Sequence, residues 1–126
     1  GQDMHTILVL RSLKILQGLH MKIQGIDYDL CVQDNLIRDF NAQAEINYVQ
    51  KKIRVDSAIY ATDRGYIAIM HEIIHGVLEG LCFEDENNNE HLVQCLAVSL
   101  YQIFKEEIEK CIDKKLQKNL ENIKEK

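Results

Sequence analysis

The fold of this chain is decided by residues 61–81, which read ATDRGYIAIMHEIIHGVLEGL. Apolar residues recur in this stretch at spacings of three and four, which predicts an amphipathic helix with one buried face. These residues are Tyr66, Ile69, Met70, Ile73, Ile74, Val77 and Leu78. We expect Asp56 or Ser57 to cap the start of this helix, and Gly80 to end it. The helix would carry an H-E-x-x-H motif, His71–His75, near its middle.

The motif has the spacing of a zinc-binding helix. Residues four positions apart lie on the same face of an α-helix, so the rings of His71 and His75 are expected to project side by side. Neutral imidazole nitrogens bind zinc at about 2.0–2.1 Å, and two such nitrogens on one face are able to share an ion. Glu72 lies beside the pair and is expected to act as the general base that takes a proton from the attacking water. The motif therefore predicts half of a hydrolytic zinc site.

The other half needs a third protein ligand, because catalytic zinc sites usually have three. The metzincin pattern places a glycine and a third histidine further along the same segment, but this chain has Leu78 and Leu81 there, which excludes that class. Glu79 is interpreted as a surface residue. Glu90 is the preferred third ligand and His91 the alternative, because both open the next predicted helix after a loop long enough to fold it back antiparallel.

Segments on the N-terminal side of the motif predict a small sheet. Alternating apolar residues indicate strands at 44–49 and 52–56, joined by a tight turn at Gln50-Lys51. Residues 21–32 fit either one strand or a hairpin that turns near Gly25-Ile26. Three to four short strands before two helices indicate the α+β class, with an antiparallel sheet packed on the motif helix and a following long helix.

The remaining segments are predicted as connections and as a second helix. Residues 33–43 and 82–89 are polar and are expected to be loops. The long helix would begin near Asn89 or Glu90 and continue to the C-terminal end. The strand at 52–56 is either a sheet edge that receives an extended peptide or an ordinary core strand.

The C-terminal tail of the long helix has an apolar stripe of its own, which runs from Ile108 to Ile123. This stripe either packs on the domain or forms a face for weak homo-oligomerisation. At the other end, residues 1–20 are either an amphipathic helix or a lead-in left by a tag. Residues 21–126 are expected to form a single domain with a long helical tail.

Composition limits the function classes. The net charge is −5 and no basic patch stands out, which argues against a nucleic-acid partner. No stretch approaches the roughly 18–20 apolar residues that a membrane span needs, so no membrane partner is expected. The four cysteines form no C-x-x-C pair, which favours reduced thiols and a cytoplasmic location.

Residues 44–104 resemble the small phage- and prophage-associated HExxH metallopeptidases related to the ImmA/IrrE group. The matching pieces are KKIRVDSAI, MHEIIHGVLEG and NEHLVQCLAVSLYQIF. The resemblance implies a minimal, gluzincin-like zincin with Zn2+ as cofactor, in which His71, His75 and Glu90 are metal ligands and Glu72 is the general base. The chain departs from the larger members of the group because it has no recognisable DNA-binding helix-turn-helix.

Motif and resemblance together predict a zinc-dependent metallopeptidase that cleaves a cytosolic protein or peptide, such as a regulator of a phage or mobile element. The alternative is a catalytically silent zincin-fold module that binds metal or another protein.

Several further residues have two interpretations. Tyr101 is interpreted as a packing residue or an outer partner of the site, whereas Tyr48, Tyr60 and Tyr66 remain alternatives for stabilising an oxyanion. Asp63 and Asn89 either orient the histidines or act as capping and loop residues, and the second interpretation is favoured.

Overall fold

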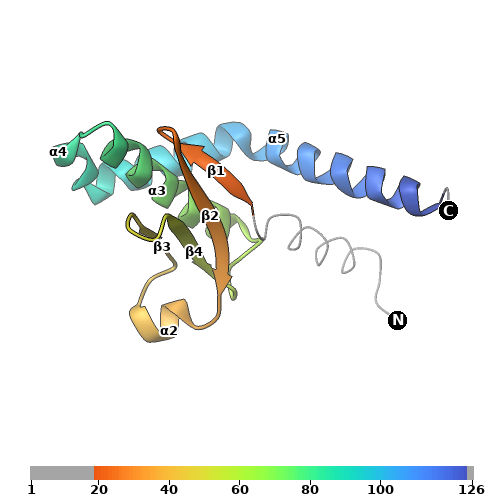
Figure 1. Ribbon diagram of the computed structural model, residues 1–126, viewed down its shortest axis with the longest axis horizontal. Coiled ribbons are helices and arrows are strands. Elements are labelled where there is room, and N and C mark those ends of the chain that lie inside the picture. Colours follow the sequence, from red (N-terminus) through yellow and green to blue (C-terminus); the bar gives the residue numbers. More distant parts are fainter. Residues whose placement is uncertain (1–18, 125–126) are drawn as a thin grey trace.

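The structure is a computed structural model that describes residues 19–124 of the chain. The prediction for residues 1–20 therefore falls almost wholly outside the described residues. Within residues 19–124, four strands and four helices follow one another in the α+β arrangement that the sequence predicts (Figure 1). The strands are β1 (His20–Ile23), β2 (Ile26–Gln33), β3 (Ala44–Asn47) and β4 (Lys52–Asp56). The helices are α2 (Leu36–Phe40), α3 (Asp63–Gly80), α4 (Glu84–Asn87) and α5 (Glu90–Lys124).

The sheet is mixed, so the prediction of an antiparallel sheet is wrong. Its strand order is β1-β2-β4-β3, and the central pair, β2 and β4, is parallel. The two hairpins, β1–β2 and β3–β4, are antiparallel as expected. The segment between the hairpins, which includes α2, passes the position that β4 later occupies, so that β3 becomes the outer strand of the sheet. Strand β4 then returns beside β2, where Leu30 pairs with Ile53 and Val32 with Val55.

This topology also settles the position of the strand at 52–56. Because β4 lies between β2 and β3, it is a central strand, which confirms the interpretation as an ordinary core strand and excludes the alternative of a sheet edge. Ile53 and Val55, which point to the same face of the sheet, are completely buried, whereas Lys52 and Arg54 on the other face are partly exposed. The outer strand on this side of the sheet is β3.

The two hairpin turns have different chemistry. The β1–β2 turn lies at Gln24-Gly25, where both residues have positive φ angles of 51° and 80°. Such a turn matches the twist of paired strands, and glycine adopts its second position without strain. The β3–β4 turn begins earlier than predicted, because the side-chain oxygen of Asn47 accepts hydrogen bonds from the backbone N–H groups of Val49 and Gln50 at 3.0 and 2.8 Å.

Helix α3 begins two residues later than the expected start and has a different cap. Thr62 is the N-cap, and its side-chain oxygen accepts a hydrogen bond from the N–H of Gly65 at 3.1 Å. The predicted cap Ser57 instead bonds to Asp34. The other predicted cap, Asp56, accepts hydrogen bonds from the backbone N–H groups of Ile37 in α2 and of Ala58 just after β4. Helix capping depends on the local φ and ψ angles, which the apolar pattern does not specify.

The helix ends at Gly80, as predicted, but the residue that reverses the chain is Cys82. Cys82 has a φ angle of 61°, in the left-handed region. The N–H of Cys82 donates to the carbonyl of Glu79, and the N–H of Phe83 donates to the carbonyl of Leu78. These two bonds make a Schellman motif, which satisfies the last carbonyls of α3 and directs the chain into α4.

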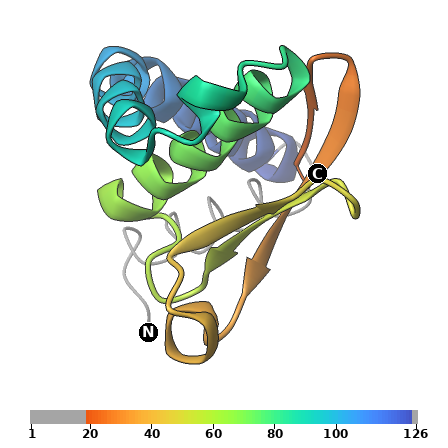
Figure 2. The same cartoon turned by 90° about the vertical axis from the view of Figure 1, so that its left-hand side faces the viewer.

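Helix α3 lies between the sheet and α5 (Figure 2). On the sheet side the contact is close at Gly76, where an added Cβ would lie 3.0 Å from Ile46 and 3.2 Å from Ile23. On the other side, Ile74 packs with Val93 and Ala97 of α5. The motif helix is therefore held on both faces.

Helix α5 extends well past the sheet and ends far from it (Figure 1). In the tail, Leu116 is 3% exposed and Ile123 is 60% exposed. The side chains of Ile108 and Ile112 lie outside the described ones, so the predicted tail stripe stays a prediction. Among residues 19–124, the helices do not combine the length and the apolar character needed to cross a membrane.

A candidate metal centre between two helices

Three of the predicted ligands converge at one point. Their ligand atoms all lie within 4.8 Å of one another. The Nε2 atom of His71 lies 2.9 Å from a carboxylate oxygen of Glu90, and that of His75 lies 3.1 Å from the other oxygen. The two Nε2 atoms are 3.1 Å apart. Ligands at about 2.0–2.1 Å in a tetrahedral arrangement are separated by roughly 3.3 Å, so this group has the dimensions of a zinc site.

The connection between the two helices places Glu90 opposite the motif. Asn89 caps α5, because its side-chain oxygen accepts a hydrogen bond from the N–H of Leu92 at 3.0 Å. This confirms the favoured interpretation of Asn89. The cap makes Glu90 the first residue of α5, and packing of Val93 and Ala97 on Ile74 turns that end of the helix toward α3.

His91, the alternative third ligand, points elsewhere. One position along a helix is a rotation of about 100°. The Nε2 atom of His91 accordingly lies 3.6 Å from Sγ of Cys95, and both residues are exposed. The structure thus brings Glu90 into the converging group and leaves His91 on the outer face of α5.

Two amide side chains fix the orientation of the imidazoles. The side-chain oxygen of Asn87 lies 2.6 Å from Nδ1 of His75, and that of Gln94 lies 2.8 Å from Nδ1 of His71. An amide oxygen only accepts hydrogen bonds, so Nδ1 is the protonated nitrogen of each ring when the ring is neutral. Each Nε2 therefore presents its lone pair to the converging group, as a zinc ligand must.

Sequence reasoning missed both amides. Gln94 lies one turn after Glu90 on the same face of α5, a spacing that could have identified it. Asn87 gives no such signal, because it belongs to the four-residue helix α4 inside a segment that looks like a loop. Asn87 also donates to Glu79 at 3.3 Å. Glu79 is exposed, which confirms its interpretation as a surface residue.

Electrostatics distinguish the two glutamates of the site. Burial raises the pKa of Glu72 to about 7; the charges of His71 and His75 oppose this, whereas Glu90 and Glu45 reinforce it. For Glu90, desolvation would raise the pKa, but the positive charges that His75 and His71 carry when protonated on both nitrogens, and their hydrogen bonds to the carboxylate, outweigh it and lower the pKa below its ordinary value. Glu90 is therefore ionised at neutral pH, as a metal ligand needs to be.

The three tyrosines considered as oxyanion stabilisers lie in different parts of the structure. The hydroxyl of Tyr48 donates to the backbone carbonyl of His75 at 3.3 Å. Tyr60 is buried in the core beside the sheet, and the ring of Tyr66 stacks on that of Tyr101 with centroids 6.0 Å apart. Tyr48 is therefore bonded to the backbone of a motif residue.

Tyr101 and Asp63 contact each other and not the histidines. Tyr101 is 5% exposed and its hydroxyl donates to Asp63 at 2.5 Å. Lys105 also bonds to Asp63, at 3.2 Å. Asp63 therefore ties the start of α3 to α5, whereas its predicted roles were to orient a histidine or to cap the helix.

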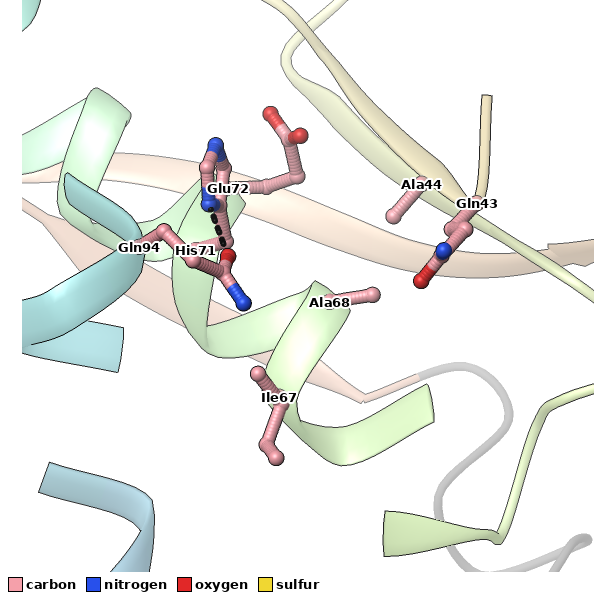
Figure 3. Close-up of a pocket in the computed structure, with 7 residues that line it drawn as sticks. All are labelled: Gln43, Ala44, Ile67, Ala68, His71, Glu72 and Gln94. Atoms are coloured by element: carbon pink, nitrogen blue, oxygen red, sulfur yellow. Dashed lines mark hydrogen bonds between the residues drawn. The ribbon is translucent and has the colours of Figure 1, made fainter. Parts of the chain in front are cut away.

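A cavity of about 280 Å³ opens beside the motif (Figure 3). Helix α3 supplies one wall, the start of β3 and the residue before it another, and α5 contributes Gln94. The residues that line it are Gln43, Ala44, Ile67, Ala68, His71, Glu72 and Gln94. The site thus combines a metal-sized group of ligands, a carboxylate next to them and space for another molecule.

Comparisons of the chain with protein family models, with curated proteins and with solved structures found no match. The resemblance to the ImmA/IrrE group remains a prediction, and the function is inferred from the site itself.

Proposed function

We propose that this chain is a zinc-dependent metallopeptidase with a minimal, gluzincin-like zincin arrangement, which hydrolyses peptide bonds of a protein substrate. The observation that carries the proposal is the convergence of His71, His75 and Glu90 next to a cavity that Glu72 lines. Two neutral imidazoles and one carboxylate are a donor set found in catalytic zinc sites, which keep one position open. Zinc bound there would polarise a carbonyl and activate a water molecule.

Each residue has a distinct task in this proposal. His71, His75 and Glu90 hold the ion, and the amide oxygens of Asn87 and Gln94 keep the imidazoles in the ligating tautomer. Glu72 accepts the proton of the attacking water and passes it to the leaving amine. This division fits a structure in which the carboxylate of Glu90 contacts both histidines while Glu72 lies on the cavity.

The substrate would lie along β3. This strand is an outer strand of the sheet, and its first residue, Ala44, lines the cavity beside Glu72. An extended peptide that adds to the outer side of β3 would pass directly over the motif. The four cysteines are free thiols, in keeping with a reducing cytoplasmic compartment. By its resemblance to prophage peptidases, we place the substrate among regulatory proteins of a phage or mobile element.

Zinc analysis and cleavage assays test the proposal together. Protein purified without added metal should contain one zinc per chain, and His71→Ala should lose it. His91→Ala is the matched control, because this histidine points away from the site, and it should keep the zinc. Metal-free wild-type protein that takes up no zinc on titration would reject the metal site.

Glu72→Gln tests the catalytic step. The variant should retain zinc but lose cleavage by at least about 100-fold, because general-base catalysis typically contributes 10²–10⁴-fold. The readout is mass spectrometry of a proteome-derived peptide mixture incubated with each protein. Zinc-loaded wild type that cleaves nothing, or no more than Glu72→Gln does, would favour the alternative, a catalytically silent metal-binding module.

A further inference from the structure

His91, which the candidate metal centre leaves out, has a partner of its own. Its Nε2 atom lies 3.6 Å from Sγ of Cys95, one turn further along α5. Residues four positions apart share one face of a helix, so the two side chains are neighbours as long as the helix is intact. Both are exposed, and they lie in the part of α5 that Asn89 caps and that packs on α3. The pair is therefore an accessible feature on a well-supported part of the helix.

The separation of the two atoms suits a shared metal ion. Zinc binds thiolate sulfur at about 2.3 Å and imidazole nitrogen at about 2.0–2.1 Å, so a sulfur and a nitrogen ligand of one tetrahedral ion are separated by roughly 3.6 Å. The separation between Cys95 Sγ and His91 Nε2 is 3.6 Å. Without an ion, the same distance accommodates a weak hydrogen bond of the thiol. A bound ion would take the place of the thiol proton, which would pass to water.

The two ligand types select the class of ion. Thiolate is a soft ligand and imidazole a borderline one, and both favour ions such as zinc, cadmium and copper(I) over magnesium and calcium, which prefer oxygen. Zinc is four-coordinate, so water would occupy the two remaining positions. With two protein ligands in place of three, this pair would bind metal more weakly than the candidate metal centre and would fill after it. His91→Ala therefore remains a valid control for the first zinc.

The other exposed cysteines lack such a partner. Cys82 and Cys111 are exposed free thiols, as Cys95 is. No histidine lies one turn before or after either of them. These two residues therefore show what an exposed thiol of this chain does when it has no imidazole beside it, and Cys111 on α5 is the matched control for Cys95.

We propose that His91 and Cys95 form a second metal site, which binds one soft or borderline ion, such as Zn2+ or Cd2+, on the outer face of α5. The site is separate from the candidate metal centre. Its ligands lie one position further along the helix than Glu90 and Gln94, which corresponds to a rotation of about 100° around the helix axis. The proposal goes beyond the proposed function and does not depend on it, because neither residue has a task in peptide hydrolysis.

Titration with Cd2+ tests the site, because a bond between Cd2+ and a thiolate absorbs in the ultraviolet, whereas histidine and carboxylate ligands lack this absorption. The chain is reduced with a reagent that contains no thiol and loaded with one equivalent of zinc before the titration. Wild type should show the absorption. Cys95→Ser should lose most of it, and Cys111→Ser should keep it. His91→Ala should bind Cd2+ at least about 10-fold more weakly, since loss of even an outer partner of a metal ligand costs 10–100-fold.

Two further variants separate chelation from other effects. His91→Cys supplies another soft ligand at the same position and should keep the affinity for Cd2+. His71→Ala removes a ligand of the candidate metal centre and should keep the Cd2+ absorption, so the second site is tested independently of the peptidase. Absence of thiolate absorption in wild type, or its persistence in Cys95→Ser, would overturn the proposal. Equal Cd2+ affinity of His91→Ala and wild type would also overturn it, because Cys95 would then bind the ion without His91.

Discussion

Single atoms of the two histidine rings decide whether the site is able to bind a metal. Nδ1 of each ring faces an amide oxygen, and this leaves Nε2 of each ring for the centre. The partners are neutral amides, so they set the tautomer without adding negative charge to the outer shell. The side-chain amide of Asn87 in turn donates a hydrogen bond to Glu79. A carboxylate therefore lies behind the amide, on the side away from the histidines' Nε2 atoms.

This arrangement predicts that Asn87 controls zinc affinity. Asn87→Ala should weaken zinc binding about 10–100-fold, because loss of a partner of a ligating histidine typically has this effect. Asn87→Asp should restore much of the affinity, since it offers an acceptor at the same place. Competition with a chromophoric chelator gives the dissociation constants. Asn88→Ala, at the exposed neighbouring asparagine, is the control. Equal zinc affinity of Asn87→Ala and wild type would show that Asn87 does not support zinc binding.

At the scale of the elements, Asp56 connects β4 with the segments around it. It is 3% exposed, and its carboxylate accepts hydrogen bonds from the backbone N–H groups of Ile37 at 2.7 Å and Ala58 at 2.8 Å. The bonds from Ile37 and Ala58 lower the pKa of Asp56 below its ordinary value. Helix α2 and the connection from β4 to α3 are thus held by one ionised side chain.

The sign of the resulting pH dependence follows from the lowered pKa. The folded state prefers the ionised form, so the contribution to stability is full above the unfolded pKa of about 3.9 and is lost as the pH falls through the lower folded value. Asp56→Asn should lower the urea midpoint at pH 7, and its difference from wild type should shrink below about pH 4. Asp27→Asn, at an exposed position, is the control. A difference that is constant from pH 7 to pH 3 would contradict the assignment.

The elements that the sequence predicts well are those long enough to show a periodic pattern of apolar residues. Helix α3 follows from seven apolar residues at helical spacing, and the two ligands on it follow from the four-residue step between His71 and His75. Helices α2 and α4 have five and four residues, too few for a periodic pattern, and were predicted as loops. Asn87 was missed for that reason.

Pairing between distant segments is the other part that the sequence does not determine. Either a parallel or an antiparallel partner would suit the apolar faces of β2 and β4, because a side-chain alternation of two says nothing about strand direction. Glu90 was predicted from the length of the loop before it and from the resemblance to the ImmA/IrrE group. The choice between Glu90 and His91 depended on the cap at Asn89, which fixes where α5 begins.

At the scale of the whole molecule, the candidate metal centre lies between two packed layers. His71 and His75 belong to α3, which packs on the sheet, and Glu90 belongs to α5, which packs on the opposite face of α3. The apolar contact between the helices has Ile74, Val93 and Ala97 as its buried residues, and the partly buried Ile67, Met70, Leu78 and Leu100 pack around them. An ion shared by the two helices would add a second link between them where the chain reverses.

Zinc binding is accordingly expected to stabilise the fold. An ion that binds only the folded state adds about 2.7 kcal/mol when its free concentration is 100 times the dissociation constant. Removal of metal with a chelator should lower the melting temperature by several degrees, since about 1 kcal/mol corresponds to roughly 2–8 °C for domains of this size range. Added zinc should restore it. His71→Ala should melt at one temperature with and without zinc, whereas His91→Ala should behave as wild type. A wild-type protein that binds one zinc with no rise in melting temperature would show that the ion does not bind the folded chain in preference to the unfolded one, which would contradict this prediction.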